Sequence, residues 1–293
     1  MAARRSARLL VLAVLLLAVL APASSGGAAS SRHHSPFAGL GTWVDIYSTK
    51  ALSDPEAAVA SMAKHGVRTL YFETGNYSHN PGVVYPDAAG RFIDAAHAAG
   101  LRVVAWYLPA FLNVRKDAHK ALAAIRFRSP AGEHFDGFAL DIEATSVRGL
   151  PLRDRRLLFL SARLRHAVPH NYPLGAITPS PVGMSPYFWP DIPYSSLTHF
   201  YKAFLPMAYF TMRGIHSRSA ASAFLTSTVS DIRAASGHPG FPVHLIGGLS
   251  GAMGREATAG FMRAVEQTKM LGFSLYAFDQ TKPAVWRALS RRS

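Results

Sequence analysis

Eight short runs of apolar and β-branched residues recur along the chain, and most are separated by a stretch long enough for a helix. The runs are apolar almost throughout, which is typical of parallel strands that are buried on both faces. Eight such units favour closure into a (β/α)8 barrel. We predict strands at residues 41–48, 67–74, 101–108, 135–144, 172–179, 203–210, 243–250 and 273–280.

Helix signals lie between these runs. Residues 54–66 begin with Asp54, a helix-capping residue type, and Pro55 follows at the first helical position. Glycine closes this segment, and it also closes the helices predicted over 87–100 and 255–272. Strands and helices therefore alternate along the whole chain, as a parallel α/β fold requires.

An open doubly wound sheet is the main alternative to a closed barrel. Such sheets typically carry a glycine-rich phosphate loop after the first strand, and residues 45–58 contain no glycine. We therefore predict an α/β fold, a (β/α)8 TIM barrel with a single domain over residues 37–293.

The segment before this domain has the pattern of an export signal. Residues 1–23 combine an arginine-bearing start, an apolar run and a small-residue exit at Ala23, which are the three parts of a secretory signal peptide. Residues 24–36 are small and polar, and we predict a flexible leader there. We expect a secreted, extracellular protein without a membrane segment in its mature form.

The formal net charge of +14 at pH 7 bears on partners. A basic exported protein is attracted to anionic polymers such as acidic cell-wall glycans, although charge also serves solubility alone. No long basic run occurs, so we expect no nucleic-acid partner. The chain has no cysteine and no close histidine pair at a predicted strand end, so we predict neither a metal site nor a cofactor.

Carboxylates gather at the ends of predicted strands, although the chain has only 17 Asp and Glu residues. They are Asp45 on the first strand, Glu73 on the second, Asp141 and Glu143 on the fourth, and Asp279 on the eighth. Barrel enzymes place their catalytic groups at the carboxyl ends of the strands. These five residues are therefore candidate site residues.

The fourth strand carries two of these acids, and alternation places Ala139, Asp141 and Glu143 on one face. Two partly desolvated carboxyl groups held close together do not both ionise readily, so one serves as an acid. We predict Glu143 as the proton donor and Asp141 as its partner. Their Cα spacing of about 6.6 Å leaves a retaining or inverting outcome open. Salt bridges with a rim arginine such as Arg148 are the structural alternative.

Aromatic residues near strand ends supply flat apolar faces on which sugar rings pack. We assign Trp106, Tyr107, Tyr209 and Tyr276 to the substrate site, with core packing as the alternative for each.

The fourth strand resembles the signature of family-18 chitinases, through Asp136-Gly137 followed by Asp141 and Glu143. Met207-Ala208-Tyr209 is similar to the Met-x-Tyr of that family's sixth strand. The resemblance implies that the glutamate protonates the glycosidic oxygen, while the aspartate and the tyrosine hold the acetamido group of the substrate.

Two positions depart from that family, because Ala139 stands in place of an aspartate and Tyr276 in place of a tryptophan. The chain also resembles family-25 lysozymes, through Asp45 on the first strand and the Asp-x-Glu on the fourth. In that resemblance the stretch GVRTLYFETGN makes Glu73 a candidate site residue. Outside these four strands the chain resembles either family only in its repeated βα pattern.

We therefore predict a secreted glycoside hydrolase-like protein that acts on a poly- or oligosaccharide, specifically an N-acetylated or cell-wall glycan. The alternative is a lectin-like barrel that binds carbohydrate without turnover. Ala139 and Tyr276 favour the lectin, whereas retention of both Asp141 and Glu143 favours the enzyme.

Overall fold

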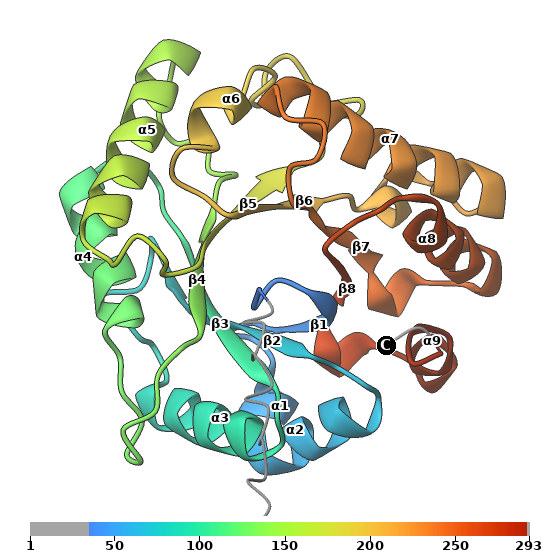
Figure 1. Ribbon diagram of the computed structural model, residues 1–293, viewed down its shortest axis with the longest axis horizontal. Helices are drawn as coiled ribbons and strands as arrows, with labels where there is room; N and C mark the ends of the chain where they lie inside the picture. Colours follow the sequence, from blue (N-terminus) through green and yellow to red (C-terminus); the bar gives the residue numbers. More distant parts are fainter. Residues whose placement is uncertain (1–34, 292–293) are drawn as a thin grey trace, which may run out of the picture. The chain divides into compact units, whose positions relative to one another are not determined.

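The computed structural model describes residues 35–291, which form a closed barrel of eight parallel strands in sequence order (Figure 1). The strands are β1 (Gly39–Val44), β2 (Thr69–Asn76), β3 (Arg102–Leu108), β4 (Gly137–Asp141), β5 (Leu174–Pro179), β6 (Ala203–Met207), β7 (His244–Leu249) and β8 (Gly272–Tyr276). All eight predicted strands are confirmed, with ends that differ by a few residues. The predicted signal peptide and nearly all of the predicted leader lie outside the described residues.

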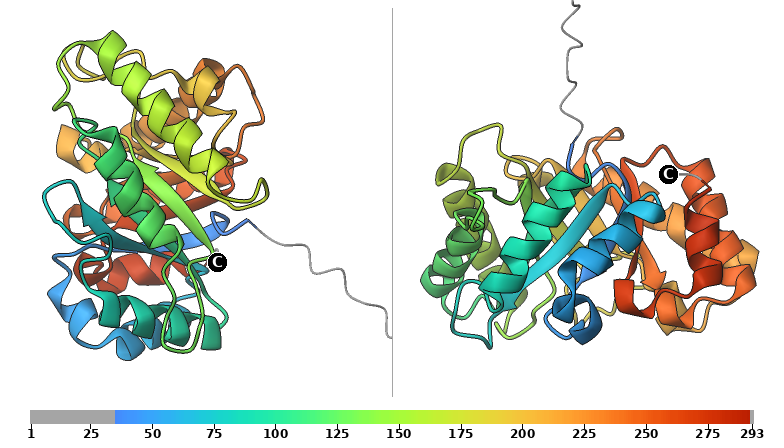
Figure 2. Two further views of the ribbon diagram at one scale, coloured as in Figure 1. Left: turned by 90° about the vertical axis from the view of Figure 1, so that its left-hand side faces the viewer. Right: turned by 90° about the horizontal axis from the view of Figure 1, so that it is seen from below.

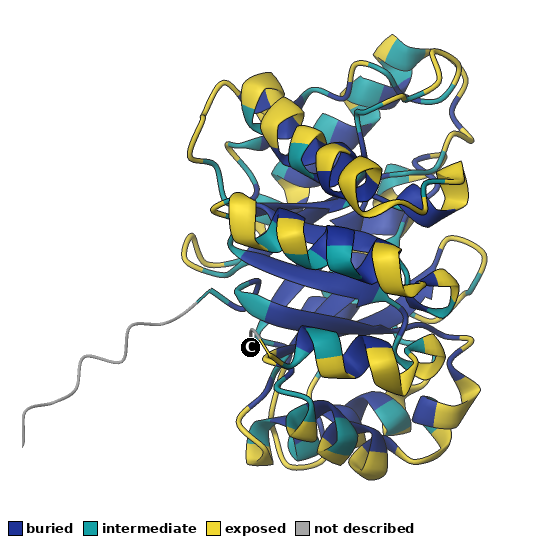
Figure 3. Ribbon diagram, turned by 90° about the vertical axis from the view of Figure 1, so that its right-hand side faces the viewer, coloured by how far each residue is buried: buried dark blue, intermediate teal, exposed yellow. Residues whose placement is uncertain are grey.

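Helices surround this barrel on its outer side (Figure 1). They are α1 (Thr49–Ser53), α2 (Pro55–Lys64), α3 (Pro86–Ala98), α4 (Val114–Ile125), α5 (Leu150–His166), α6 (Tyr194–Leu197), α7 (Arg218–Ser236), α8 (Arg255–Gln267) and α9 (Pro283–Leu289), with 3-10 turns η1 (Phe210–Arg213), η2 (Ser250–Ala252) and η3 (Phe278–Gln280). The strands are buried, and the helices expose only their outer sides (Figure 3). Over residues 35–291, no helix has the length and apolar character needed to cross a membrane.

Local sequence explains where most of the predicted helices begin and end. The Asp54 carboxylate accepts a hydrogen bond from the Ala57 backbone N–H at 3.1 Å, so it caps α2 as predicted. The helix predicted over 87–100 is confirmed as α3, and Gly100 follows it with a φ of +74°.

The helix predicted over 255–272 is shorter than expected, because α8 ends at Gln267 and Gly272 opens β8. A Cβ atom at Gly272 would lie 2.3 Å from His244 Nδ1 and 2.4 Å from the Phe37 carbonyl oxygen. Gly272 therefore permits close approach between β8 and its neighbours, and it does not end a helix.

The core has two layers, one on each side of the strands. Phe138, Leu140 and Ile142 of the fourth strand region belong to the outer layer, between the barrel and the helices. Ala139 belongs to the inner layer, which also contains Trp106. The predicted alternation of faces along this strand is therefore confirmed.

A hydrogen-bonded chain crosses the barrel interior. The Trp43 indole N–H donates to Ser274 Oγ at 2.8 Å, and Ser274 Oγ lies 2.9 Å from His244 Nε2. His244 Nδ1 lies 2.8 Å from the Phe37 carbonyl oxygen, so the ring donates there and accepts from Ser274 as a neutral imidazole. Burial lowers the pKa of His244 to about 4, so the neutral ring serves a structural role in the barrel interior.

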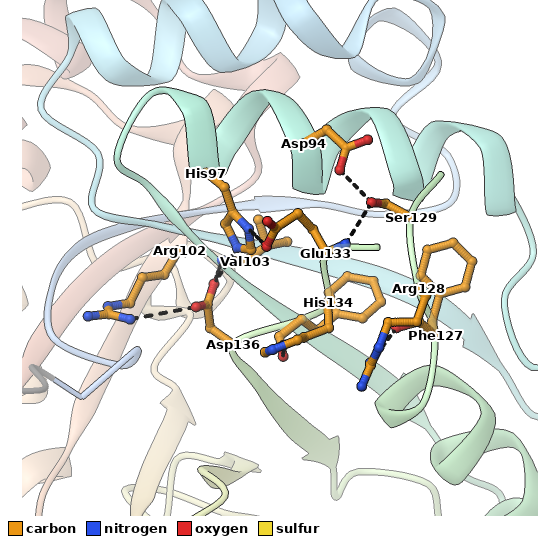
Figure 4. A network of polar contacts seen from close by, with 11 residues as sticks. Asp94, His97, Arg102, Val103, Phe127, Arg128, Ser129, Glu133, His134 and Asp136 are labelled. Carbon is orange, nitrogen blue, oxygen red and sulfur yellow. Dashed lines mark hydrogen bonds and ion pairs between the residues drawn. The ribbon is translucent and has the colours of Figure 1, made fainter. Parts of the chain in front are cut away.

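A polar network lies where β3 and β4 begin, at the end of the barrel opposite the predicted catalytic acids (Figure 4). The two ring nitrogens of His97 lie 2.9 Å from a Glu133 carboxylate oxygen and 3.0 Å from an Asp136 carboxylate oxygen. The Asp136 carboxylate also accepts from the Val103 backbone N–H at 2.8 Å and lies 3.6 Å from the Arg102 guanidinium. Because carboxylates only accept, His97 donates from both nitrogens as an imidazolium.

Replacing His97 by Gln is expected to destabilise the protein in a pH-dependent way. The hydrogen bond to Asp136 raises the pKa of His97, with smaller contributions from the charge of Asp136 and from Glu133. The stabilisation is fully present below the unfolded pKa of about 6.5, and it is lost as pH rises through the higher folded pKa. Urea unfolding should show a deficit of about 1–2 kcal/mol in the variant near pH 5.5.

The difference in free energy of unfolding between wild type and the His97→Gln variant should shrink near about pH 8.5. Other titrating groups, including the buried His244, contribute equally to the free energy of unfolding of wild type and variant, so their contributions cancel in the difference between the two proteins. A deficit that stays constant over this range would show that the ring is neutral in the folded protein.

Candidate active site

A cavity of about 380 Å³ lies at the carboxyl ends of the strands. Its walls come from β2, β3, β4, β6 and β8 and from segments that follow β1, β2, β4 and β6. The lining residues are Tyr47, Glu73, Asn76, Tyr77, Ser78, Trp106, Leu108, Asp141, Glu143, Met207, Tyr209 and Tyr276. Six of the nine sequence-predicted site residues are among them.

The acid pair of the fourth strand faces this cavity. Asp141 is the last residue of β4 and is only 5% exposed, and its Oδ1 atom has no hydrogen-bond partner among residues 35–291. Glu143 lies two residues beyond the strand, which the sequence predicts to continue to Ala144. The last backbone hydrogen bond between this strand and β5 runs from the Ile142 N–H to the Ile177 carbonyl. Beyond it the chain enters the loop that leads to α5.

The pKa values of both acids of the pair are raised above the ordinary values of Asp and Glu. Burial raises the pKa of Asp141, and the neighbouring carboxylates of Glu143 and Glu73 raise it further. Burial also raises the pKa of Glu143, which is partly exposed in the cavity. Desolvation therefore widens the pH range over which each of these carboxyl groups keeps its proton.

Glu73 forms the third acidic group of the cavity and is held from two sides. Its two carboxylate oxygens accept from the Ile46 backbone N–H at 3.1 Å and from the Asn76 side-chain amide at 3.3 Å. Burial is the main cause that raises its pKa to about 7, and the charges of Asp45 and Glu143 add to it. Glu73 therefore changes charge near neutral pH.

Asp45 lies behind the cavity wall and supports Tyr276. One carboxylate oxygen accepts from the Tyr47 backbone N–H and from Ser48 Oγ, each at 2.9 Å, and the other accepts from the Tyr276 hydroxyl. Burial raises the pKa of Tyr276, and the hydrogen bond and the charge of Asp45 raise it further. Asp45 follows β1 and Tyr276 ends β8, and these two strands are neighbours where the barrel closes. Asp45 therefore orients the ring of Tyr276, which lines the cavity.

Three predicted aromatic residues line the cavity. Trp106 is 6% exposed, and within the described chain its indole N–H has no hydrogen-bond partner. The rings of Tyr209 and Tyr276 lie 6.1 Å apart between centroids. Burial raises the pKa of Tyr209, as do the charges of Asp141 and Glu143, so its hydroxyl stays neutral and can donate a hydrogen bond.

Besides Asp45, two further predicted site residues do not line the cavity. Tyr107 faces the outer layer, where its hydroxyl donates to Asp117 of α4 at 2.8 Å, because neighbours on a strand face opposite sides and Trp106 takes the inner one. Asp279 lies in η3, where its carboxylate accepts from the Ala51 backbone N–H at 3.3 Å. Both side chains support the surrounding structure.

Sequence reasoning missed the segment that follows Glu73. Strand β2 continues to Asn76 through a shift in register at Gly75, which has a φ of +154°. This shift brings Asn76, Tyr77 and Ser78 to the cavity. The glycine two residues after the strand-end acid is a signal for such a bulge.

Three acidic side chains line the cavity, and no basic side chain among the described lining residues balances them. None of its described lining side chains is Lys, Arg or His. The ion pairs formed within residues 35–291 do not include Asp141 or Glu143, and Arg148 is exposed. The salt-bridge alternative for the acid pair is therefore not realised in the described structure. No group of three or more His, Cys, Asp or Glu suited to a metal ion occurs over the same residues.

Comparison with known proteins identifies the fold. No family model matches the sequence, and no curated protein matches it either. Among solved structures, the endo-1,4-β-mannanase from Rhizomucor miehei is similar with a TM-score of 0.63 at 10% identity, over 87% of this chain and 93% of the mannanase.

Two further structures extend this likeness. The spore cortex-lytic enzyme SleL from Bacillus cereus has a TM-score of 0.63 at 8% identity, over 87% of this chain and 74% of SleL. A chitinase from Bacteroides thetaiotaomicron has a TM-score of 0.59 at 10% identity, over 87% of this chain and 96% of the chitinase. The chain therefore shares the overall fold of these three enzymes.

Proposed function

We propose that the protein is an exported glycoside hydrolase in which Glu143 protonates the glycosidic oxygen and Asp141 is its partner. The observation that carries the proposal is the pair itself, in which a buried carboxyl group with an unpartnered oxygen adjoins a second acid in a cavity. Perturbed carboxyl groups in a cavity are typical of catalytic sites. The mannanase, cortex-lytic enzyme and chitinase that share this fold support the same class.

We assign a role to each of these groups in the proposed reaction. Glu143 donates its proton as the bond from the anomeric carbon to the glycosidic oxygen breaks, so the leaving sugar departs as an alcohol. Water completes hydrolysis at the anomeric carbon and returns a proton to the protein. Glu73 in its ionised form supplies negative charge beside the positive charge that develops on the sugar ring. Asp141 offers its unpartnered carboxyl oxygen to the substrate.

An N-acetylated sugar fits the unpartnered groups of the cavity. Asp141 Oδ1 lacks a donor and Trp106 Nε1 lacks an acceptor within the described chain, and an acetamido group carries one N–H and one carbonyl. The absence of Lys, Arg and His from the described lining disfavours a carboxylated or phosphorylated sugar at this position. We therefore propose a neutral, N-acetylated glycan of the cell-wall type as substrate.

A substrate panel tests this assignment. Purified protein is incubated with chitin oligosaccharides, peptidoglycan, an α-linked neutral glycan and an acidic polysaccharide, and both cleavage and binding are measured. Cleavage of an N-acetylated glycan alone is the expected result. Binding without cleavage of any member would replace the hydrolase by a lectin-like barrel, and preferred cleavage of the acidic polymer would overturn the substrate class.

A further inference from the structure

A second polar depression lies on the helical surface between α4 and α5, which run side by side (Figure 2). It has a volume of about 260 Å³. We call it the basic groove, and its lining residues are Arg115, Ala118, His119, Leu122, Ala123, Arg126 and Arg163. Three guanidinium groups and an imidazole therefore adjoin a few small apolar side chains.

Arg115 and His119 of α4, together with Arg126 directly after its last residue, lie along one face of the helix. At about 100° per residue, Arg126 is rotated by only about 20° from Arg115, and His119 by about 40°. Eleven residues correspond to about 16 Å along the helix axis. Arg163 contributes from α5 across the groove. A row of this length is too long for a single small anion and suits a chain with repeated negative charges.

Acidic side chains do not balance this row. Asp117 of α4 is buried and accepts from the Tyr107 hydroxyl, and Asp154 of α5 accepts from the Trp189 indole N–H. These are the only acids within the two helices. In the part of the chain that the structure describes, no ion pair involves Arg115, Arg126 or Arg163, although all three are exposed.

We propose that the basic groove binds a linear acidic polysaccharide. Guanidinium groups form paired hydrogen bonds with carboxylates, and the row offers them at several positions along one polymer. The cavity at the strand ends is lined by acidic residues, so it disfavours a negatively charged polymer. The protein would therefore be held on an anionic polymer through its helices while the cavity remains available to a neutral glycan.

Polygalacturonate is the probe for this site. Binding of the full protein is measured by titration at about 50 mM and about 200 mM NaCl, because screening weakens contacts between exposed charges. Simultaneous Arg115→Ser, Arg126→Ser and Arg163→Ser changes are expected to weaken binding by about tenfold at the lower salt concentration. Arg255→Ser, Arg263→Ser and Arg287→Ser remove the same charge from exposed positions on α8 and α9, and they should change the affinity by less than about twofold.

Each outcome decides the proposal. Equal losses in the two triple variants would show that net charge alone attracts the polymer, and tighter binding of duplex DNA than of polygalacturonate would overturn the polysaccharide assignment. Thermal unfolding confirms that both variants are folded. Because the readout is binding at residues that do not line the cavity, the result is independent of whether the cavity hydrolyses a glycan.

Discussion

Replacing Glu143 by Gln is expected to lower the rate of glycan hydrolysis by about 10²–10⁴-fold, because an amide cannot supply the proton that the leaving oxygen needs. Burial raises the pKa of Glu143, so the wild-type group is available as an acid. The amide has the same shape as the protonated carboxyl group, and binding of the oligosaccharide should change little. Initial rates and equilibrium binding on the same N-acetylated oligosaccharide separate the two effects.

Glu256→Gln is the matched control for this variant. Glu256 lies on α8, is exposed and pairs with Arg218, so the substitution should leave both hydrolysis and binding unchanged. If Glu143→Gln retained wild-type rates, the proton donor would have to be another acid of the cavity. Glu73 would then be the candidate, because its pKa is raised to about 7.

The second large effect concerns stability. Gly272→Ala is expected to lower the free energy of unfolding by about 3 kcal/mol or more, because the new methyl group meets atoms that cannot move aside. Its Cβ would lie 2.4 Å from the Phe37 carbonyl oxygen and 2.8 Å from that of Gly39, and both are backbone atoms. The strands β1, β7 and β8 would have to separate where the barrel closes.

Gly240→Ala provides the comparison, since no described atom lies within 4 Å of the position that the alanine methyl group would take and the φ of Gly240 is not in the left-handed region. Urea unfolding should show a change within about 0.5 kcal/mol for this variant. Similar losses at Gly240 and Gly272 would mean that chain flexibility, and not the contact with Phe37, explains the role of Gly272.

The fold was predictable because its signal is repeated. Each strand is a short apolar run and each helix carries its own start or stop residues, such as Asp54 and Gly100, so eight local patterns point to one architecture. The helix that ends at Gln267 was predicted too long because Gly272 resembles a helix stop. Its contacts come from residues that lie far away in the sequence.

The candidate site was predictable only in part. Alternation along β4 correctly places Asp141 toward the barrel interior, and strand-end position selects Glu73 and Trp106 as well. Tyr107 adjoins Trp106 in sequence but faces the helices, and sequence reasoning assigned both to the site. Asp45 contributes through the hydroxyl of Tyr276 and does not line the cavity itself.

The sequence by itself determined the number and order of the strands, the gathering of acids at their ends and the excess of positive charge, since each depends on residues that are neighbours in the chain. Tertiary structure alone decided which of these groups meet. Closure of the barrel brings Asp45 to Tyr276 across 231 positions, and packing of α4 on α5 brings Arg163 to the arginines of α4. Burial and distance set the pKa of each acid and the partner of each cation, and both arise only when distant segments pack together.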